Sequence, residues 1–207
     1  MTLAEAWNGT IWNLVESPSL SGSGFDAVAC TAMNACTAVG GYDGTGYLTL
    51  AEAWNGAEWQ QQTTVNPAPG RYAVLVGVSC VAASACTAVG SFQDGYGQPA
   101  ILVEVGDWST WTMPMVADPG DAGNDPAAVS CTATDACTAV GGFNGGSSAT
   151  LAEVGNGIKW KQQTTPNPAG ATSDALYGVS CTGVKVCTAV GNSFSSSDGS
   201  GPLAETE

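Results

Sequence analysis

The chain has 207 residues, a formal net charge of −14 and no histidine. Eighteen acidic residues against four basic ones argue against nucleic-acid binding and against docking on anionic membranes, since both require a basic face. The lack of histidine excludes Ser-His-Asp and Cys-His catalysis and histidine-ligated metals. We therefore expect no cofactor, no nucleic-acid partner and no membrane partner.

The chain consists of repeats of about fifty residues. Each contains two cysteines separated by five residues and followed by Thr-Ala-Val-Gly, at residues 30–40, 80–90, 131–141 and 181–191. A fixed period of this length predicts a repeat architecture. We expect a single repeat domain over 1–207, with units at approximately 28–75, 76–126 and 127–177. Residues 1–27 together with 178–207 would form the fourth unit.

Each unit contains four strand-like runs, at 76–80, 86–92, 100–105 and 111–115 in the second unit. Asn-Gly turns join the last two runs in three of the units, at 8–9, 55–56 and 156–157, and Asn-Gly is the strongest short hairpin signal. No segment has a helical apolar stripe, and glycine and proline are frequent. These features predict an all-β fold, specifically a four-bladed β-propeller.

The strand count bears on how such a ring would close. The Leu-Ala-Glu strand occurs five times, whereas the other three strands occur four times each. Residues 11–15 supply the strand that the C-terminal unit lacks, so we expect N- and C-terminal strands to close the ring within one blade. The surplus strand, 2–7 or 203–206, would then fray or pair with a neighbouring chain.

The eight cysteines are predicted to form four local disulfides. Each pair lies at the mouth of a hairpin, where facing cysteines can reach disulfide geometry; the pairs are Cys30–Cys36, Cys80–Cys86, Cys131–Cys137 and Cys181–Cys187. The alternative is eight reduced cysteines packed as small apolar residues. A metal site is not expected, because the spacing is not Cys-x2-Cys. Disulfides imply an extracytoplasmic location, secreted or at the cell surface.

Two motifs recur, Val-Ser-Cys-x5-Cys-Thr-Ala-Val-Gly and Leu-Ala-Glu-x-Trp-Asn-Gly-x-x-Trp, and a third, Thr-Pro-Asn-Pro-Ala-Gly, stands at 165–170. They resemble repeats of exported actinobacterial proteins, which are largely uncharacterised. The resemblance covers essentially the whole chain and departs most at Val103 and at Gly106-Asp107-Trp108. It implies a propeller-like fold but supplies no activity and no catalytic residues.

The repeated glutamate is the sharpest chemical feature of the sequence. Strand alternation places it on one face with the neighbouring leucine and tryptophan, where a buried carboxylate is costly unless it is hydrogen-bonded. We interpret these glutamates as structural carboxylates that latch successive blades; they are Glu5, Glu52, Glu104, Glu153 and Glu205. A ring of them holding a cation, or a pair performing acid–base chemistry, are the alternatives. The tryptophans Trp12, Trp59, Trp111 and Trp160 recur with the same period and predict core packing.

The long, variable loops all emerge on one rim of the predicted blades, opposite the cysteine and Asn-Gly hairpins. They carry aromatic rings beside Asp or Asn, a mixture that can stack on a sugar and bind its hydroxyls. The candidate binding residues are Tyr42, Asp43, Tyr47, Phe92, Asp94, Tyr96, Phe143, Asn144, Phe194 and Asp198. The alternative is ordinary loop chemistry, with aromatics turned inward and Asp-Gly forming turns.

These observations favour a non-catalytic, lectin-like module that binds carbohydrate or another small polar ligand. An alternative is a structural protein that self-associates into oligomers or filaments by exchanging the surplus Leu-Ala-Glu strand. A glycan hydrolase using loop carboxylates ranks lowest.

Overall fold

The computed structural model describes residues 2–18, 20–68, 71–116, 123–144, 148–197 and 199–206, with the backbone alone for Arg71 and Asn144. The described residues form strands joined by turns, which confirms the all-β prediction. They include no helix that is long and apolar enough to cross a membrane.

Each repeat folds as an antiparallel sheet whose strands follow chain order. The first sheet is β3 (Gly24–Ala32), β4 (Ala35–Gly44), β5 (Gly46–Trp54) and β6 (Trp59–Gln61). The second is β7 (Arg71–Ala82), β8 (Ala85–Gln93), β9 (Pro99–Gly106) and β10 (Trp111–Thr112). The third is β12 (Asn124–Ala133), β13 (Ala136–Asn144), β14 (Ser148–Gly155) and β15 (Lys159–Gln163).

The last repeat has three strands, β16 (Ala171–Gly183), β17 (Val186–Ser195) and β18 (Gly199–Thr206). A parallel bridge between Ser148 and Ser173 joins it to the third repeat. The short strand β11 (Met115–Val116) pairs in parallel with β15 and completes an eight-stranded sheet. At the other end of the chain, β1 (Ala4–Trp7) and β2 (Trp12–Val15) form a separate two-stranded sheet.

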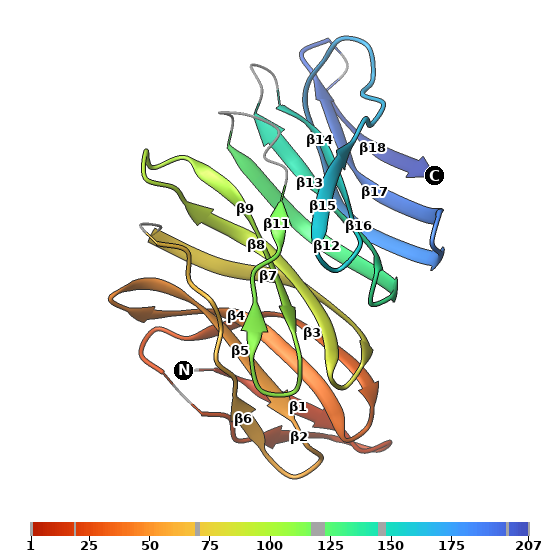
Figure 1. The fold of residues 1–207 in the computed structure, drawn as a ribbon. Helices are drawn as coiled ribbons and strands as arrows, with labels where there is room; N and C mark the ends of the chain where they lie inside the picture. Colours follow the sequence, from red (N-terminus) through yellow and green to blue (C-terminus); the bar gives the residue numbers. More distant parts are fainter. Residues whose placement is uncertain are drawn as a thin grey trace.

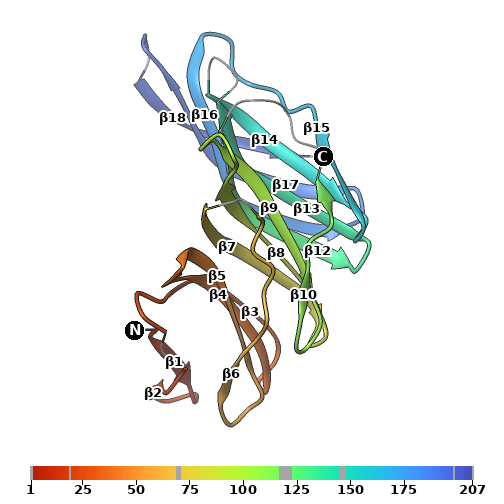
Figure 2. The same ribbon diagram turned by 60° about the vertical axis from the view of Figure 1, so that its left-hand side comes forward.

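The sheets follow one another in a row from the N-terminal end, drawn in red, to the C-terminal end, drawn in blue (Figures 1 and 2). The hairpin β1–β2 lies at one end of this row and β18 at the other. Among the described strands, β1 and β2 pair only with each other, and β18 pairs only with β17. The pairing expected to close a ring is therefore not among those of the described strands.

Side-chain oxygens of Asn and Asp build the turns between the third and fourth strands. Asn55 Oδ1 accepts hydrogen bonds from the backbone N–H groups of Ala57 and Glu58, at 2.9 and 3.0 Å. Gly56 adopts a left-handed φ of 95°, which glycine allows without strain. The second sheet lacks Asn-Gly, yet Asp107 Oδ1 accepts from Ser109 and Thr110 N–H in the same way. This turn therefore has the same hydrogen-bonded structure as the Asn-Gly turns, although its sequence predicts it less strongly.

The glycine that ends Cys-Thr-Ala-Val-Gly is required by a close approach of two backbones. A Cβ added to Gly90 would lie 1.8 Å from the carbonyl oxygen of Val74. The register of β7 against β8 shifts between Leu75 and Gly77, directly beside this contact. The equivalent glycines Gly40, Gly141 and Gly191 have the same clash at 2.0, 2.2 and 1.9 Å. Each repeat therefore places a glycine opposite a bulge in its first strand.

All four predicted disulfides are present, each joining cysteines whose Cα atoms are 4.0 Å apart. The disulfide sulfurs also form hydrogen bonds between neighbouring sheets. The Thr37 hydroxyl donates to Cys86 Sγ in the next sheet at 3.4 Å, because a bonded sulfur carries no proton. The same contact recurs as Thr87–Cys137 and Thr138–Cys187. The disulfide hairpins therefore lie against the preceding sheet as well as closing their own.

The run predicted as one strand at 111–115 is divided in the structure. Strand β10 ends at Thr112, and Met115–Val116 pairs with the next repeat instead. Pro114, which lies between the two segments, has no N–H to donate to a ladder, and this explains the interruption.

Candidate functional site

Four aromatic side chains predicted to line the loops occupy one equivalent position, the end of the second strand of each repeat. Tyr42 faces Leu48, Phe92 faces Ala100, Phe143 faces Ala149 and Phe194 faces Ser200 across the following hairpin. Phe92 and Phe143 pack partly against core clusters, whereas Phe194 is 44% exposed. These rings are therefore shared between the core and the rim.

In the first repeat the structure brings two predicted residues together. Asp43 lies opposite Tyr47 across the hairpin. Burial raises the pKa of Tyr47, and the carboxylates of Asp26 and Asp43 raise it further. Asp26, whose own pKa is raised by burial, was not predicted as part of this cluster. The cluster combines a phenol with two acidic groups.

In the second repeat the predicted residues do not converge on a ligand site. Asp94 Oδ1 accepts from the N–H groups of Tyr96 and Gln98, at 2.8 and 2.9 Å, so this carboxylate shapes its own turn. Tyr96 projects from that turn and is 92% exposed. Of the remaining candidates, the side chain of Asn144 and the whole of Asp198 lie outside the described residues.

A polar depression lies beside Phe143. It has a volume of about 200 Å³ and is lined by Phe143, Thr150, Gln162, Gln163, Thr164, Thr165 and Asn167. Asn167 Oδ1 accepts from the backbone N–H and the hydroxyl of Thr150, at 2.9 and 3.2 Å, which fixes this wall. Gln162 and Thr164 are exposed and can turn their polar groups to a ligand. We call this depression the Phe143 pocket.

Sequence reasoning found Phe143 but missed the polar wall of this pocket. That wall comes from Gln-Gln-Thr-Thr-Pro-Asn-Pro, which comprises the end of the fourth strand, β15, and the residues directly after it. The same pattern in the first repeat places Asn66 Oδ1 3.0 Å from the backbone nitrogen of Thr49. The recurrence of Thr-Thr-x-Asn-Pro was thus the signal that could have identified these residues.

An apolar depression of about 370 Å³ occupies the corresponding place in the second repeat. Phe92, Ile101, Met113 and Met115 are among its lining residues. This repeat has Met-Pro-Met-Val where the first and third repeats have Gln-Gln-Thr-Thr, so its wall offers apolar contact in place of hydrogen bonds. The two depressions therefore differ in the chemistry that they can recognise.

Three of the repeated glutamates are buried, and one is exposed in the N-terminal hairpin. Glu52 and Glu104 are completely buried and Glu153 is 1% exposed, whereas Glu5 in the N-terminal hairpin is exposed. Glu104 Oε2 accepts from the N–H of Val65 in the preceding repeat at 3.1 Å. Glu205 Oε1 lies 3.4 Å from the hydroxyl oxygen of Thr150, again in the preceding repeat. Glu104 and Glu205 thus contact the preceding repeat, whereas Glu5 is exposed, and the interpretation of all five glutamates as latches stays a prediction.

Burial changes the acidity of these groups. Desolvation raises the pKa of Glu104 to about 7, although hydrogen bonds from Val65 and Thr49 oppose the shift. Desolvation likewise raises the pKa of Glu52 to about 7, although this side chain lies beside the Ser17 hydroxyl, which opposes the shift. Neither oxygen of Glu52 has a hydrogen bond of ordinary geometry among the described residues. In the part of the chain that the structure describes, no three acidic or cysteine side chains are grouped closely enough to hold a metal ion.

The described lining of the Phe143 pocket contains hydroxyls, amides and one aromatic ring, and it includes no carboxylate. Such a lining can bind a neutral polar ligand, but it has no acid–base pair.

No protein-family model matches this chain, and a comparison with curated proteins finds no significant match either. The resemblance to exported actinobacterial repeats therefore stays a prediction.

Proposed function

We propose that this protein is a non-catalytic binding module that recognises neutral carbohydrate at the Phe143 pocket. The observation that carries this proposal is the combination of an aromatic ring with exposed amide and hydroxyl groups in one depression. Sugars present apolar C–H faces and hydroxyl groups, which such a mixed surface can bind together. No basic side chain is among the described lining residues, so neutral glycans fit better than sulfated or uronic ones.

A hydrolase remains the least favoured function. Glycoside hydrolysis needs two carboxyl groups flanking one bond. The buried glutamates lie singly, in different contacts between sheets, and the Phe143 pocket has no carboxylate among its described lining residues.

We also propose that the protein is secreted or displayed at the cell surface, since its four disulfides are consistent with an oxidising compartment. We further propose that the repeats are propeller-type blades; a four-bladed ring closed within one chain is the alternative to the exchange between copies that is proposed below. The propeller-type blades are supported by repeats of like strand order that stack through recurring Thr–Cys contacts. Closure within one chain would require β2 and β18 to share a sheet, and a cross-link between Asn13 and Thr206 tests this.

The binding proposal is tested by screening the full chain on a glycan array and measuring the affinity of the strongest neutral oligosaccharide by calorimetry. We expect the double variant Gln162→Ala/Thr164→Ala to weaken binding about tenfold or more, because each lost hydrogen bond contributes roughly 0.5–1.5 kcal/mol. Gln60→Ala is the matched control, since Gln60 is exposed on β6 and bonds only its neighbour Glu58.

Two results would contradict the proposal. One is an array without any bound glycan at high protein concentration. The other is a glycan whose affinity is unchanged in the double variant, which would place the ligand elsewhere.

A further inference from the structure

The contact between the first two sheets is built around a tryptophan of the fourth strand. Trp111 is 3% exposed and packs with Val39 and Ala51 of the first repeat and with Leu75 and Ala88 of the second. A glutamine from the preceding repeat holds its indole: Gln62 Oε1 accepts from Trp111 Nε1 at 3.0 Å. The Gln62 amide also donates to the carbonyl of Trp108, in the adjoining turn, at 2.7 Å.

The next contact repeats this arrangement. Trp160 is 2% exposed and packs with Val89, Val103 and Ala139, which stand at the positions of Val39, Ala51 and Ala88. A buried tryptophan of the fourth strand is thus a regular part of the contact between two sheets.

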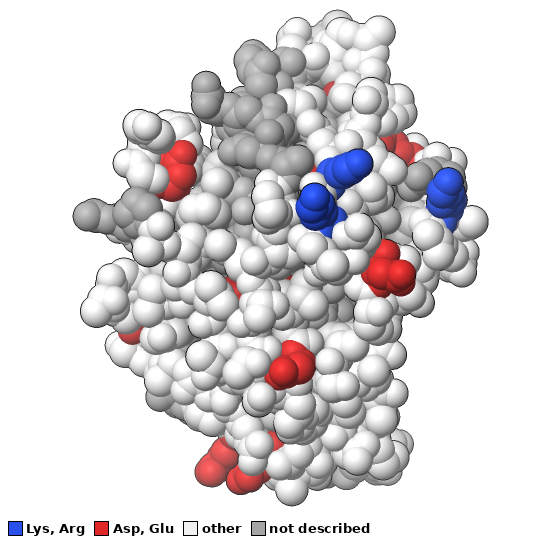
Figure 3. All heavy atoms as spheres, viewed as in Figure 1, with Lys and Arg blue, Asp and Glu red and all other residues white. Residues whose placement is uncertain are grey.

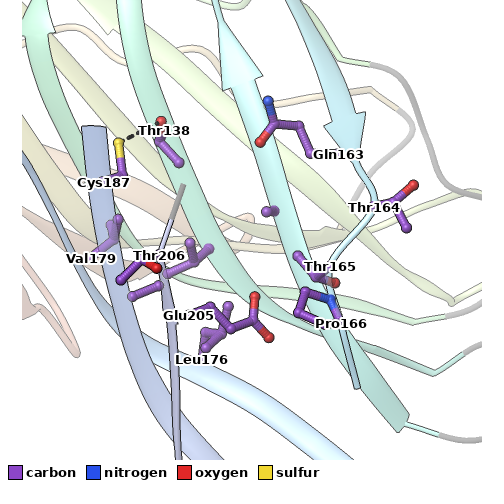
Figure 4. A pocket seen from close by; sticks show the side chains of 13 residues that line it. Thr138, Gln163, Thr164, Thr165, Pro166, Leu176, Val179, Cys187, Glu205 and Thr206 are labelled. Atoms are coloured by element: carbon purple, nitrogen blue, oxygen red, sulfur yellow. Dashed lines mark hydrogen bonds between the residues drawn. The ribbon is translucent and has the colours of Figure 1, made fainter. Parts of the chain in front are cut away.

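Within the described ranges, the contact between the third and last repeats has the same lining, but no fourth strand there supplies a tryptophan. Val140, Ala152, Leu176 and Ala189 occupy the positions of Val39, Ala51, Leu75 and Ala88. Here they line a pocket of about 150 Å³ (Figure 4). Gln163, which stands at the position of Gln62, is on its wall. We call this cavity the terminal pocket.

Of the four fourth-strand tryptophans, Trp111 and Trp160 are buried, Trp59 is half-buried and Trp12 is exposed. Trp12 on β2 is 63% exposed, and Leu14 on the same strand is 68% exposed. Strand β2 pairs only with β1, and an isolated two-stranded hairpin is marginally stable in water. The Leu-Ala-Glu sequence of β1 recurs in β18, whose outer edge is unpaired among the described strands.

We propose that Trp12 of a second copy of this chain fills the terminal pocket, with β18 taking the place of β1 beside β2 of that copy. The exchange turns a two-stranded hairpin and a three-stranded unit into one four-stranded sheet of the kind seen in the other repeats. The sequence predicted that a Leu-Ala-Glu strand is exchanged between chains. Here the exchanged strand is β2, which carries Trp12, and the Leu-Ala-Glu strand β18 pairs with it.

The sheet faces at the two ends of the molecule support the same docking. Val190 is 52% exposed, whereas its counterparts Val39, Val89 and Val140 are 0, 0 and 2% exposed beneath a following sheet. Thr188 is also exposed, although its counterpart Thr138 bonds Cys187 in the next repeat. At the opposite end of the molecule, the one described sheet that precedes the disulfide Cys30–Cys36 is the two-stranded hairpin β1–β2. Thr188 of one copy and the disulfide Cys30–Cys36 of the next could therefore form the Thr–Cys contact that recurs between successive sheets.

Charge also favours an acidic partner at the C-terminal end. The three lysines, Lys159, Lys161 and Lys185, line a cavity of about 460 Å³ beside the terminal pocket, which also shares Gln163. Basic side chains gather in the upper right of Figure 3, whereas acidic ones extend to the lower end of the molecule. Residues 2–18 carry Glu5 and Glu16 and no basic residue. The N-terminal segment of a second copy is thus complementary to this end.

The partner is a second copy because the two ends of one chain lie apart. The hairpin β1–β2 and strand β18 stand at opposite ends of the row of sheets (Figures 1 and 2). Each intervening contact is fixed by hydrogen bonds such as Ser79 Oγ to the N–H of Cys131 and Ser130 Oγ to that of Cys181, both 3.0 Å. Such a head-to-tail contact uses different surfaces on the two copies, so it extends into longer oligomers or closes a ring of copies.

The first test is light scattering of the full chain over a range of concentrations. We expect the mean molar mass to rise at least twofold, and Trp12→Ala to weaken this association roughly tenfold or more, as expected for loss of a central aromatic anchor. Trp12 is exposed in the single chain, so its substitution leaves folding intact. Trp7→Ala is the matched control, because Trp7 lies on β1, which the exchange releases. A wild-type chain that stays monomeric throughout would overturn the proposal.

The second test distinguishes a second copy from closure within one chain. By the register in which Ala53 faces Gln60 and Val154 faces Lys161, Thr206 should face Asn13. A mixture of Asn13→Cys and Thr206→Cys proteins should form a covalent heterodimer, and the double variant should form a ladder on a non-reducing gel. Thr45→Cys mixed with Thr206→Cys is the control. A double variant that cross-links only internally would establish the closed ring and refute the second copy.

Discussion

At the scale of single residues, the buried glutamates make stability depend on pH. The pKa of Glu104 is about 7 in the folded chain, above its ordinary value of 4.5. Between these values the folded state holds a proton that the unfolded state has released. The free energy of unfolding therefore falls as pH rises through this window and is level above it.

We predict that Glu104→Gln removes much of this dependence. The wild type should lose up to about 3 kcal/mol between pH 5 and pH 8, with Glu52 adding a loss of the same sign. The variant keeps an oxygen acceptor for the Val65 N–H and cannot ionise. Urea unfolding at the two pH values measures the effect, with Glu58→Gln as the exposed control. Equal slopes in wild type and Glu104→Gln would contradict the prediction.

A second prediction concerns the glutamine that holds the buried indole. Gln62→Ala leaves Trp111 Nε1 buried without its acceptor, so we expect a loss of about 1–3 kcal/mol. Gln60→Ala, two residues away and exposed, should change stability by less than about 0.5 kcal/mol. Chemical denaturation of both variants provides the comparison, and equal losses would argue that the Gln62–Trp111 contact contributes little.

The chain contains a natural counterpart of that variant. Pro114 stands at the position of Gln62, and Trp160 Nε1 is buried without a hydrogen-bond partner among the described residues. One sheet contact therefore already lacks the glutamine that its neighbour has.

At the scale of the strand, the bulge opposite each terminal glycine decides whether a repeat can form. Gly90→Ala would put a methyl group 1.8 Å from the oxygen of Val74, so two paired strands must separate. We predict a loss of at least about 2–3 kcal/mol, in the range of severe backbone and packing defects. Gly24→Ala is the control, because a Cβ there meets nothing within 4 Å. Thermal unfolding of the two variants tests this, and similar midpoints would refute it.

The sequence predicted those elements whose structure depends on residues close together in the chain. The disulfide hairpins and the Asn55-Gly56 turn depend on residues a few positions apart, and both were predicted. The first strand of the second repeat was expected at 76–80 but spans Arg71–Ala82. The register of this strand shifts between Arg71 and Val74 and again between Leu75 and Gly77. These shifts interrupt the alternation of inward- and outward-facing side chains, which is the sequence signal that would locate the start of the strand. The division at Pro114 was missed because β11 pairs with β15 of another repeat.

At the scale of the whole molecule, contacts between distant segments set the limit of prediction. The Phe143 pocket joins the end of β13 to the segment that follows β15, and strand patterns alone could not reveal that meeting. The burial expected for Trp12 was wrong for the single chain, because its hairpin has only two strands. The shared strand order of the repeats could be predicted from the sequence. The exposure of Trp12 and the pocket between the third and last repeats could be seen only in the structure.

The disulfides have a consequence for how such a chain is made and how its length can change. Eight cysteines allow about 105 complete pairings, yet each bond here joins residues six positions apart in one hairpin. Each bond can therefore form as soon as its own hairpin has been made, without waiting for later cysteines. A gene that gains or loses one whole unit leaves every remaining bond correctly paired.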